Sequence, residues 1–144
     1  MNVELPERGL LDTNILILRR RLPHGQLRGE LAISAVTLAE LSAGVHMVRG
    51  DDAEASAERA NRMALLQLVE NEFDPIPFDQ QAARMFGRMS AAVHASGRTP
   101  RQRTADLMIA ATASVESIPL YTTNPSDFDG LEGLVAIIPV PRPE

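Results

Sequence analysis

The segment Leu10-Leu11-Asp12-Thr13-Asn14-Ile15-Leu16-Ile17-Leu18 places three polar residues between two apolar runs. The first run follows Gly9 and has the character of a buried strand, while the second continues as a helix, so the polar residues lie at the changeover. In open parallel sheets, ligand sites lie outside the carboxyl ends of the strands. Asp12 therefore places a charge at the tip of a buried element, where it needs neutralisation.

Further strands and helices alternate along the rest of the chain. We expect strands at Leu31–Ser34, Pro119–Thr123 and Leu134–Val140, with an edge strand or connector at Phe73–Phe78. Helices are expected from Thr37, over Ala53–Glu70, over Asp79–Ala95 and from Thr104. This order predicts an α/β sandwich with a mostly parallel central sheet flanked by helices. With 144 residues, 44% of them hydrophobic, the chain has the size of one domain, residues 1–144.

Composition excludes several kinds of chemistry. The chain has no Cys, which rules out disulfides, thiolate nucleophiles and cysteine zinc sites. All fourteen basic residues are Arg, so a Walker-type phosphate loop and lysine Schiff bases are absent. The net charge of −5 disfavours a protein that coats nucleic acid, but not an enzyme that cuts it. Neither a leader pattern nor a membrane-length apolar run is present, and we expect a cytoplasmic location without membrane contact.

Four carboxylates stand beside apolar runs: Asp12, Glu40, Asp106 and Asp127. Each has an ordinary explanation when taken alone. Asp12 suits a turn or helix cap, and Thr37-Leu38-Ala39-Glu40 matches a capping box. Asp106 would gain from the dipole of a buried helix, and Asp127 lies in a turn-forming loop.

Taken together, the four acids predict a shared site. Carboxylates within about 4 to 6 Å of one another raise each other's pKa, so a cluster without a cation is destabilising. An all-oxygen pocket suits Mg²⁺ or Mn²⁺, and either one or two ions would fit this pattern. A phosphodiester substrate would also need positive charge. The loop Gly97–Arg103 offers Arg98, Arg101 and Arg103, and the run Arg19–Arg21 is a second candidate.

The three histidines carry no comparable signal. His24, His46 and His94 lie in unrelated contexts, without an Asp or Ser at a spacing that indicates a triad. We therefore interpret them as surface or core residues.

The acidic segments, in order, resemble the PIN-domain ribonucleases, and among them the VapC-type toxins of toxin–antitoxin pairs. The matching pieces are LDTN at 11–14, SAVTLAEL at 34–41 with Gly44, DLMIAATA at 106–113 and TTNPSDF at 122–128. Each piece is weak, but four in order cover most of the chain. About eight residues precede the first strand, where such toxins often begin almost directly, and a Pro-rich tail spans 141–144.

The resemblance implies a PIN-like three-layer sandwich and a Mg²⁺-dependent endoribonuclease in which Mn²⁺ can substitute. Its metal and catalytic residues would be Asp12, Glu40, Asp106 and Asp127, although Asn124 is an alternative fourth group. Thr13, Asn14 and Asn124 would support the site or the substrate by hydrogen bonds. The resemblance further implies an RNA substrate, a homodimer and a VapB-like antitoxin whose tail blocks the site.

Two other classes of function remain open from the residues alone. A receiver-type module also gathers acids around Mg²⁺, but it requires a lysine that this chain lacks. A non-catalytic PIN-like scaffold would use the four acids only as caps and turns.

Overall fold

The computed structural model describes residues 7–23 and 25–143. At its centre lies a sheet of four strands in the order β2-β1-β3-β4. The strands are β1 (Arg8–Leu11), β2 (Glu30–Ala32), β3 (Leu120–Thr122) and β4 (Ile137–Pro139). All three pairings are parallel, which confirms the predicted α/β class.

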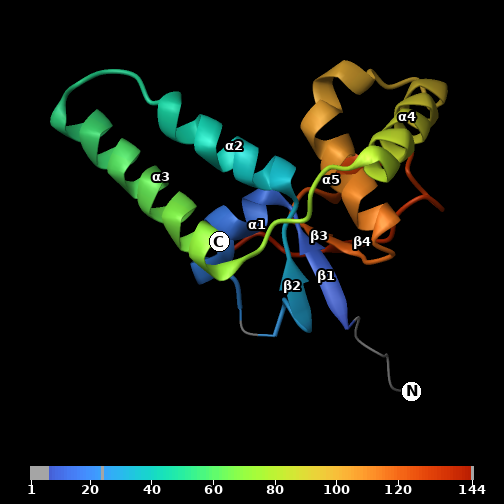
Figure 1. Cartoon of the computed structure of the whole chain (residues 1–144), viewed down its shortest axis with the longest axis horizontal. Helices are drawn as coiled ribbons and strands as arrows, with labels where there is room; N and C mark the ends of the chain where they lie inside the picture. Colours follow the sequence, from blue (N-terminus) through green and yellow to red (C-terminus); the bar gives the residue numbers. More distant parts are fainter. Residues whose placement is uncertain (1–6, 24, 144) are drawn as a thin grey trace.

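Within the described residues, five α-helices connect and cover these strands. They are α1 (Thr13–Leu18), α2 (Ala35–His46), α3 (Ala53–Glu72), α4 (Gln80–Ala95) and α5 (Thr104–Val115). Three short 3₁₀ turns accompany them: η1 (Arg19–Arg21), η2 (Pro100–Arg103) and η3 (Pro125–Phe128). In Figure 1, α2 and α3 form a two-helix arm on one side of the molecule, and α4 and α5 lie on the other.

Alternation along the strands builds two hydrophobic cores. Leu10 and Leu120 are fully buried against α4 and α5, within one core cluster. Their neighbours Leu11 and Tyr121 point to the opposite face, where they pack with residues of α1, α2 and α3. Successive strand residues face opposite sides of a sheet, so both faces are covered. The result is the expected three-layer arrangement, with helices on both sides of the sheet.

Strand order reverses between β1 and β3. From β1 the chain passes outward to β2, and it later returns to place β3 and then β4 on the other side of β1. Leu10 lies opposite Leu120, and Leu11 lies opposite Tyr121. Crevices at such a reversal, outside the carboxyl ends of the strands, are the usual ligand sites of open parallel sheets. Asp12 and Thr123 directly follow the two strands at this point.

The start of one predicted helix bears on the position of Glu40 and differs from the structure. Helix α2 begins at Ala35, because the Ser34 side chain caps it by accepting a hydrogen bond from the amide of Val36 at 3.0 Å. For Phe73–Phe78 the connector alternative is confirmed, with Ile76 forming a single parallel bridge with Ser34.

The ends of the chain are described only in part. Residue 8, assigned from sequence to an extension, belongs to β1, while residues 1–6, His24 and residue 144 lie outside the described residues. Within the described ranges, no helix combines the length and the apolarity that crossing a membrane requires.

Candidate active site

Asp12 is the most buried of the four predicted acids, with 4% of its surface exposed. Its backbone is extended at the end of β1, and its carboxylate caps α1 by accepting a hydrogen bond from the Thr13 amide at 2.9 Å. The second oxygen, Oδ2, accepts a hydrogen bond from the Thr122 hydroxyl at 2.7 Å. Burial raises the pKa of Asp12, and these two hydrogen bonds oppose that rise. Capping therefore fixes the orientation of Asp12 at the switch point.

Glu40 comes from α2 and reaches the same place through Thr13. The Thr13 hydroxyl donates a hydrogen bond to Glu40 Oε1 at 2.6 Å. The hydroxyl of the buried Thr37 lies 3.1 Å from the Thr13 hydroxyl. The capping-box interpretation of Thr37–Glu40 is wrong, because the helix starts at Ala35 and places Glu40 in its second turn. Its carboxylate is thereby directed to the start of α1.

Asp106 lies in the first turn of α5, with 27% of its side chain exposed. Its pKa is raised to about 6, first by burial and then by the charges of Asp12, Asp127 and Glu40; Arg103 opposes the shift. Three carboxylates from separate segments therefore act on one group. The sheet and its helices bring together acids that are far apart in the sequence.

Asp127 reaches the cluster from η3 by way of an arginine. Arg103 donates from Nη1 to Asp127 Oδ1, and the same nitrogen lies 3.9 Å from Asp106 Oδ2. Asp127 does not line the pocket that contains the other three acids. The Asn124 side-chain oxygen is occupied by another partner, since it accepts a hydrogen bond from Arg142 at 2.7 Å. Of these two alternatives, Asp127 is the one that is electrostatically linked to Asp106.

A pocket of about 540 Å³ opens in front of these groups. Asp12, Glu40 and Asp106 line it together with Thr13 and Asn14. The remaining lining comes from Ile17, Leu41 and Gly44 and from the α3 residues Glu58, Asn61, Arg62 and Leu65.

Sequence reasoning missed the α3 wall of this pocket. Arg62 donates to Glu58 Oε1 and to the carbonyl of Gly44, both at 2.8 Å. In sequence, Glu58 and Arg62 read as an ordinary i,i+4 pair on a helix surface, which gives no signal of a site. Thr122 was also missed, although its position next to Asp12 on the neighbouring strand follows from a parallel sheet.

The three loop arginines separate into different roles. Arg98 donates to the carbonyl of Ser126 at 2.9 Å and lies 3.7 Å from the carboxylate of Asp129, so it anchors η3. Arg101 is exposed, and Arg103 points inward to the acids.

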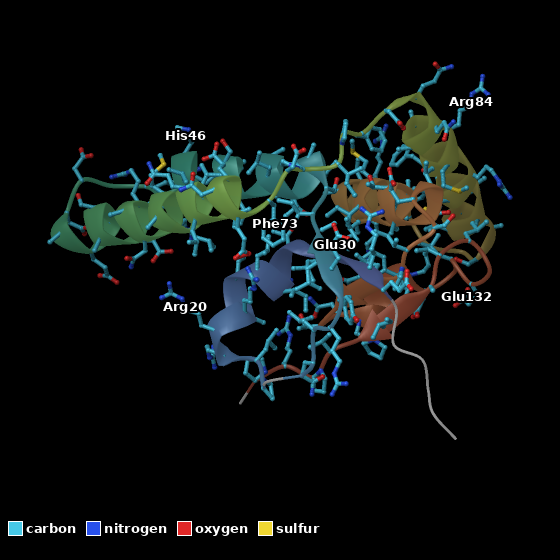
Figure 2. All side chains as sticks on the ribbon, turned by 60° about the horizontal axis from the view of Figure 1, so that its bottom comes forward. Arg20, Glu30, His46, Phe73, Arg84 and Glu132 are labelled. Atoms are coloured by element: carbon cyan, nitrogen blue, oxygen red, sulfur yellow. The ribbon has the colours of Figure 1, made fainter. Side chains whose placement is uncertain are left out.

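The second basic run and the histidines lie elsewhere. Arg19 pairs with Glu72 and stacks over the ring of Phe73, whereas Arg20 is exposed and points away from the ribbon in Figure 2. His46 lies on the α2–α3 arm in the same view.

The carboxylate oxygens of Asp12, Glu40 and Asp106 suit a hard divalent cation, because Mg²⁺ prefers oxygen ligands. Among the described residues, no three acidic or imidazole side chains are arranged to enclose one ion. Mg²⁺ sites commonly use one or two carboxylates and keep several waters, so an open pocket lined by Asp12, Glu40 and Asp106 fits such an ion. Among the described residues, one or two of these three carboxylates would hold the ion.

Comparison with known proteins agrees with this geometry. The PIN domain family model matches residues 9–134. Ribonuclease VapC5 of Mycobacterium tuberculosis is 36% identical over 135 residues, which cover 92% of this chain and 93% of that protein. Ribonuclease VapC1 of Rickettsia felis is 28% identical over 132 residues, covering 87% and 91%. The crystal structure of VapBC-5, a toxin–antitoxin system of M. tuberculosis, matches with a TM-score of 0.75 and 33% identity, covering 94% of this chain and 99% of that one.

The chain belongs to the PIN-domain family. Within that family it is of the VapC ribonuclease type, as the length and level of these similarities show. The resemblance read from the four acidic segments is thereby confirmed.

Proposed function

We propose that this protein is a toxin-type endoribonuclease that hydrolyses RNA phosphodiester bonds with the help of Mg²⁺, for which Mn²⁺ can substitute. The observation that carries the proposal is the environment of Asp106. Burial and three other carboxylates raise its pKa to about 6, an arrangement that a divalent cation would relieve. Similarity to the VapC ribonucleases supports the same chemistry.

When bound, the cation supplies Lewis acidity at the phosphoryl oxygen and lowers the pKa of water. The chain's own residues hold the geometry. Thr122 and the Thr13 amide orient the two oxygens of Asp12, and the Thr13 hydroxyl orients Glu40. Because the supporting groups are themselves buried or bonded, the carboxylates lose little freedom when they bind.

The pocket also offers groups for RNA. Asn14 and Asn61 present amides that can pair with the edges of unstacked bases, which is how single-stranded RNA is usually read. Arg62 in the wall and the exposed Arg101 supply guanidinium groups, which suit phosphate. Asp127 we place as the outermost member of the acidic cluster, because it acts on Asp106 without lining the pocket.

The direct test is RNA cleavage by Asp106→Asn. We expect cleavage in Mg²⁺ to fall by roughly two orders of magnitude or more, as when a fixed charge at a reacting centre is removed. Asp51→Asn is the matched control, since Asp51 is exposed in the bend before α3.

Chelator should abolish wild-type cleavage, Mn²⁺ should restore it, and the fragment ends should show hydrolysis. Wild-type rates in Asp106→Asn, or no cleavage of any RNA by the wild type in either metal, would contradict the proposal. A non-catalytic scaffold would give the second result.

For the partner we propose a VapB-like antitoxin. A second hollow, of about 790 Å³, lies beside the acidic pocket and shares Ile17, Asn61 and Leu65 with it. Ile17 and Leu68 are 56% and 48% exposed there, so apolar surface is available next to negative charge. An antitoxin segment with apolar residues and a basic end would fit both. The related VapBC-5 structure is of a toxin–antitoxin system.

We also propose that the protein forms a homodimer. The arm formed by α2 and α3 carries the exposed Met47 and Met63, which can supply apolar contact area. The mass in solution, measured by light scattering, tests this directly.

A further inference from the structure

Arg103 stands apart from the other arginines of its loop. It ends η2 immediately before α5, and its guanidinium bonds to Asp127 while lying 3.9 Å from Asp106. Arg101, two residues earlier, is exposed, and Arg98 is used to anchor η3. A solvated phosphate-binding loop would not require one guanidinium to turn back into the acids.

The contacts of Arg103 are shielded enough to be effective. The side chains of Arg103, Asp106 and Asp127 are between 27% and 30% exposed, so water and salt screen these pairs less than a surface pair. Arg62 lies on another wall of the pocket, where it donates hydrogen bonds to Glu58 and Gly44. Within the described residues, Arg103 is the cation that pairs with members of the acidic cluster.

One guanidinium is insufficient to neutralise the cluster. Four ionised carboxylates and Arg103 leave a net negative charge, and the acids still disfavour one another's ionisation at Asp106. Arg103 therefore neutralises part of the negative charge of the acidic cluster. It does so at the place where the proposed divalent cation would have to bind.

We propose that Arg103 is a built-in counter-cation of the acidic site, so that a divalent cation binds in competition with its guanidinium for Asp106 and Asp127. The inference rests on the proposed function, because it takes Asp106 to be part of the metal site. An arginine cannot escape the competition by losing its proton. Metal loading must therefore move the Arg103 side chain away from the carboxylates, and the affinity for metal is set lower than the acids alone would give.

The test measures Mn²⁺ binding directly, by the electron paramagnetic resonance signal of the free ion, in the absence of RNA. Arg103→Gln should bind Mn²⁺ roughly fivefold more tightly than the wild type, which corresponds to the loss of one partly screened charge pair. Arg101→Gln is the matched control from the same turn and should match the wild type. If Arg103→Gln binds Mn²⁺ equally or more weakly, Arg103 positions the acids and does not compete, and the inference is wrong.

Two further variants separate charge from shape. Arg103→Lys keeps the positive charge and should stay near the wild-type affinity; tightening equal to that of Arg103→Gln would overturn the inference. In an Asp127→Asn background, which lacks the main partner of Arg103, Arg103→Gln should tighten binding less than it does in the wild type.

The experiment also distinguishes the inference from the function on which it rests. If the wild type and all variants fail to bind Mn²⁺ at millimolar concentration, both the metal site and the inference fail. If the wild type binds Mn²⁺ and Arg103→Gln gives no gain, the inference alone fails. Circular dichroism of each variant verifies that it is folded before titration.

Discussion

Asp106 shows how a single residue records the arrangement of the whole site. Its pKa is raised from 3.8 to about 6, because burial and the charges of Asp12, Asp127 and Glu40 disfavour the ionised form. The folded protein therefore binds a proton at Asp106 more readily than the unfolded chain does. Above about pH 6, the ionised carboxylate reduces stability, by up to about 3 kcal/mol for a shift of this size. That cost in stability disappears as the pH falls below 3.8, the pKa of this carboxyl in the unfolded chain.

This linkage predicts a pH-dependent gain in stability for Asp106→Asn. In chelator at about pH 7.5, the variant should have a higher free energy of unfolding than the wild type, because it removes a charge that folding disfavours. The difference should narrow through about pH 5 and close below about pH 3, where the wild-type carboxyl is protonated in both states. Urea unfolding at several pH values measures it. A difference that stays constant with pH would mean that lost packing or the lost Arg103 contact dominates.

Individual site residues differ in how far sequence alone could predict their position. Asp12 follows a strand, so its place at the carboxyl edge of a parallel sheet was predictable. The convergence of Glu40 and Asp106 on the same pocket followed from the family pattern, since nothing local in either segment specifies the partner. Asn61 and Arg62 were not predictable, because they reach the pocket only through the way that α3 folds back along α2. The metal-binding and catalytic roles of the four acids, Asp12, Glu40, Asp106 and Asp127, stay predictions.

At the scale of elements, the start of α2 decides where Glu40 points. Sequence placed Ser34 at the end of a strand and Thr37 at the cap, whereas Ser34 is itself the N-cap. The two roles are hard to tell apart, because a cap residue has extended backbone, here φ −84° and ψ 149°. Most other elements were predicted to within a few residues, since their apolar periodicity and their Asp79 and Gly97 boundary signals are local.

The cap can be tested by Ser34→Ala. Loss of the hydrogen bond to the Val36 amide should lower the free energy of unfolding by about 1 kcal/mol, with an unchanged denaturant slope. Ser42→Ala, inside the same helix, is the control and should cause no loss, because Ala is the better helix former. Equal effects of the two substitutions would argue against Ser34 as the cap.

On the scale of the whole molecule, the acidic pocket and the neighbouring hollow form one continuous surface through Ile17, Asn61 and Leu65. Helix α3 borders both, so a partner lying along it would reach the carboxylates. A few well-packed residues near the centre of an interface carry most of its binding energy. Leu68 is a large exposed apolar residue of α3 that lines the second hollow.

Leu68→Glu should therefore weaken binding of the cognate VapB-like antitoxin by roughly tenfold or more, because it buries a charge at an apolar anchor. Isothermal titration of the purified proteins measures the dissociation constant. Gln67→Glu, which adds the same charge at the neighbouring exposed position of α3 but outside this hollow, is the matched control. Equal loss in both variants would place the antitoxin elsewhere on the arm or indicate general damage to α3.

The pairing of β1 with β3 has a consequence for synthesis of the protein. Leu10 of β1 pairs with Leu120 of β3, far along the chain. Asp127 lies in η3, which follows β3. Contacts of such long sequence separation slow folding, because a long loop must close before they form. A chain still growing on a ribosome holds Asp12 and Glu40 long before Asp106 and Asp127 exist to join them. On the proposed assignment of all four acids to the active site, the growing chain is expected to stay inactive until it is nearly complete.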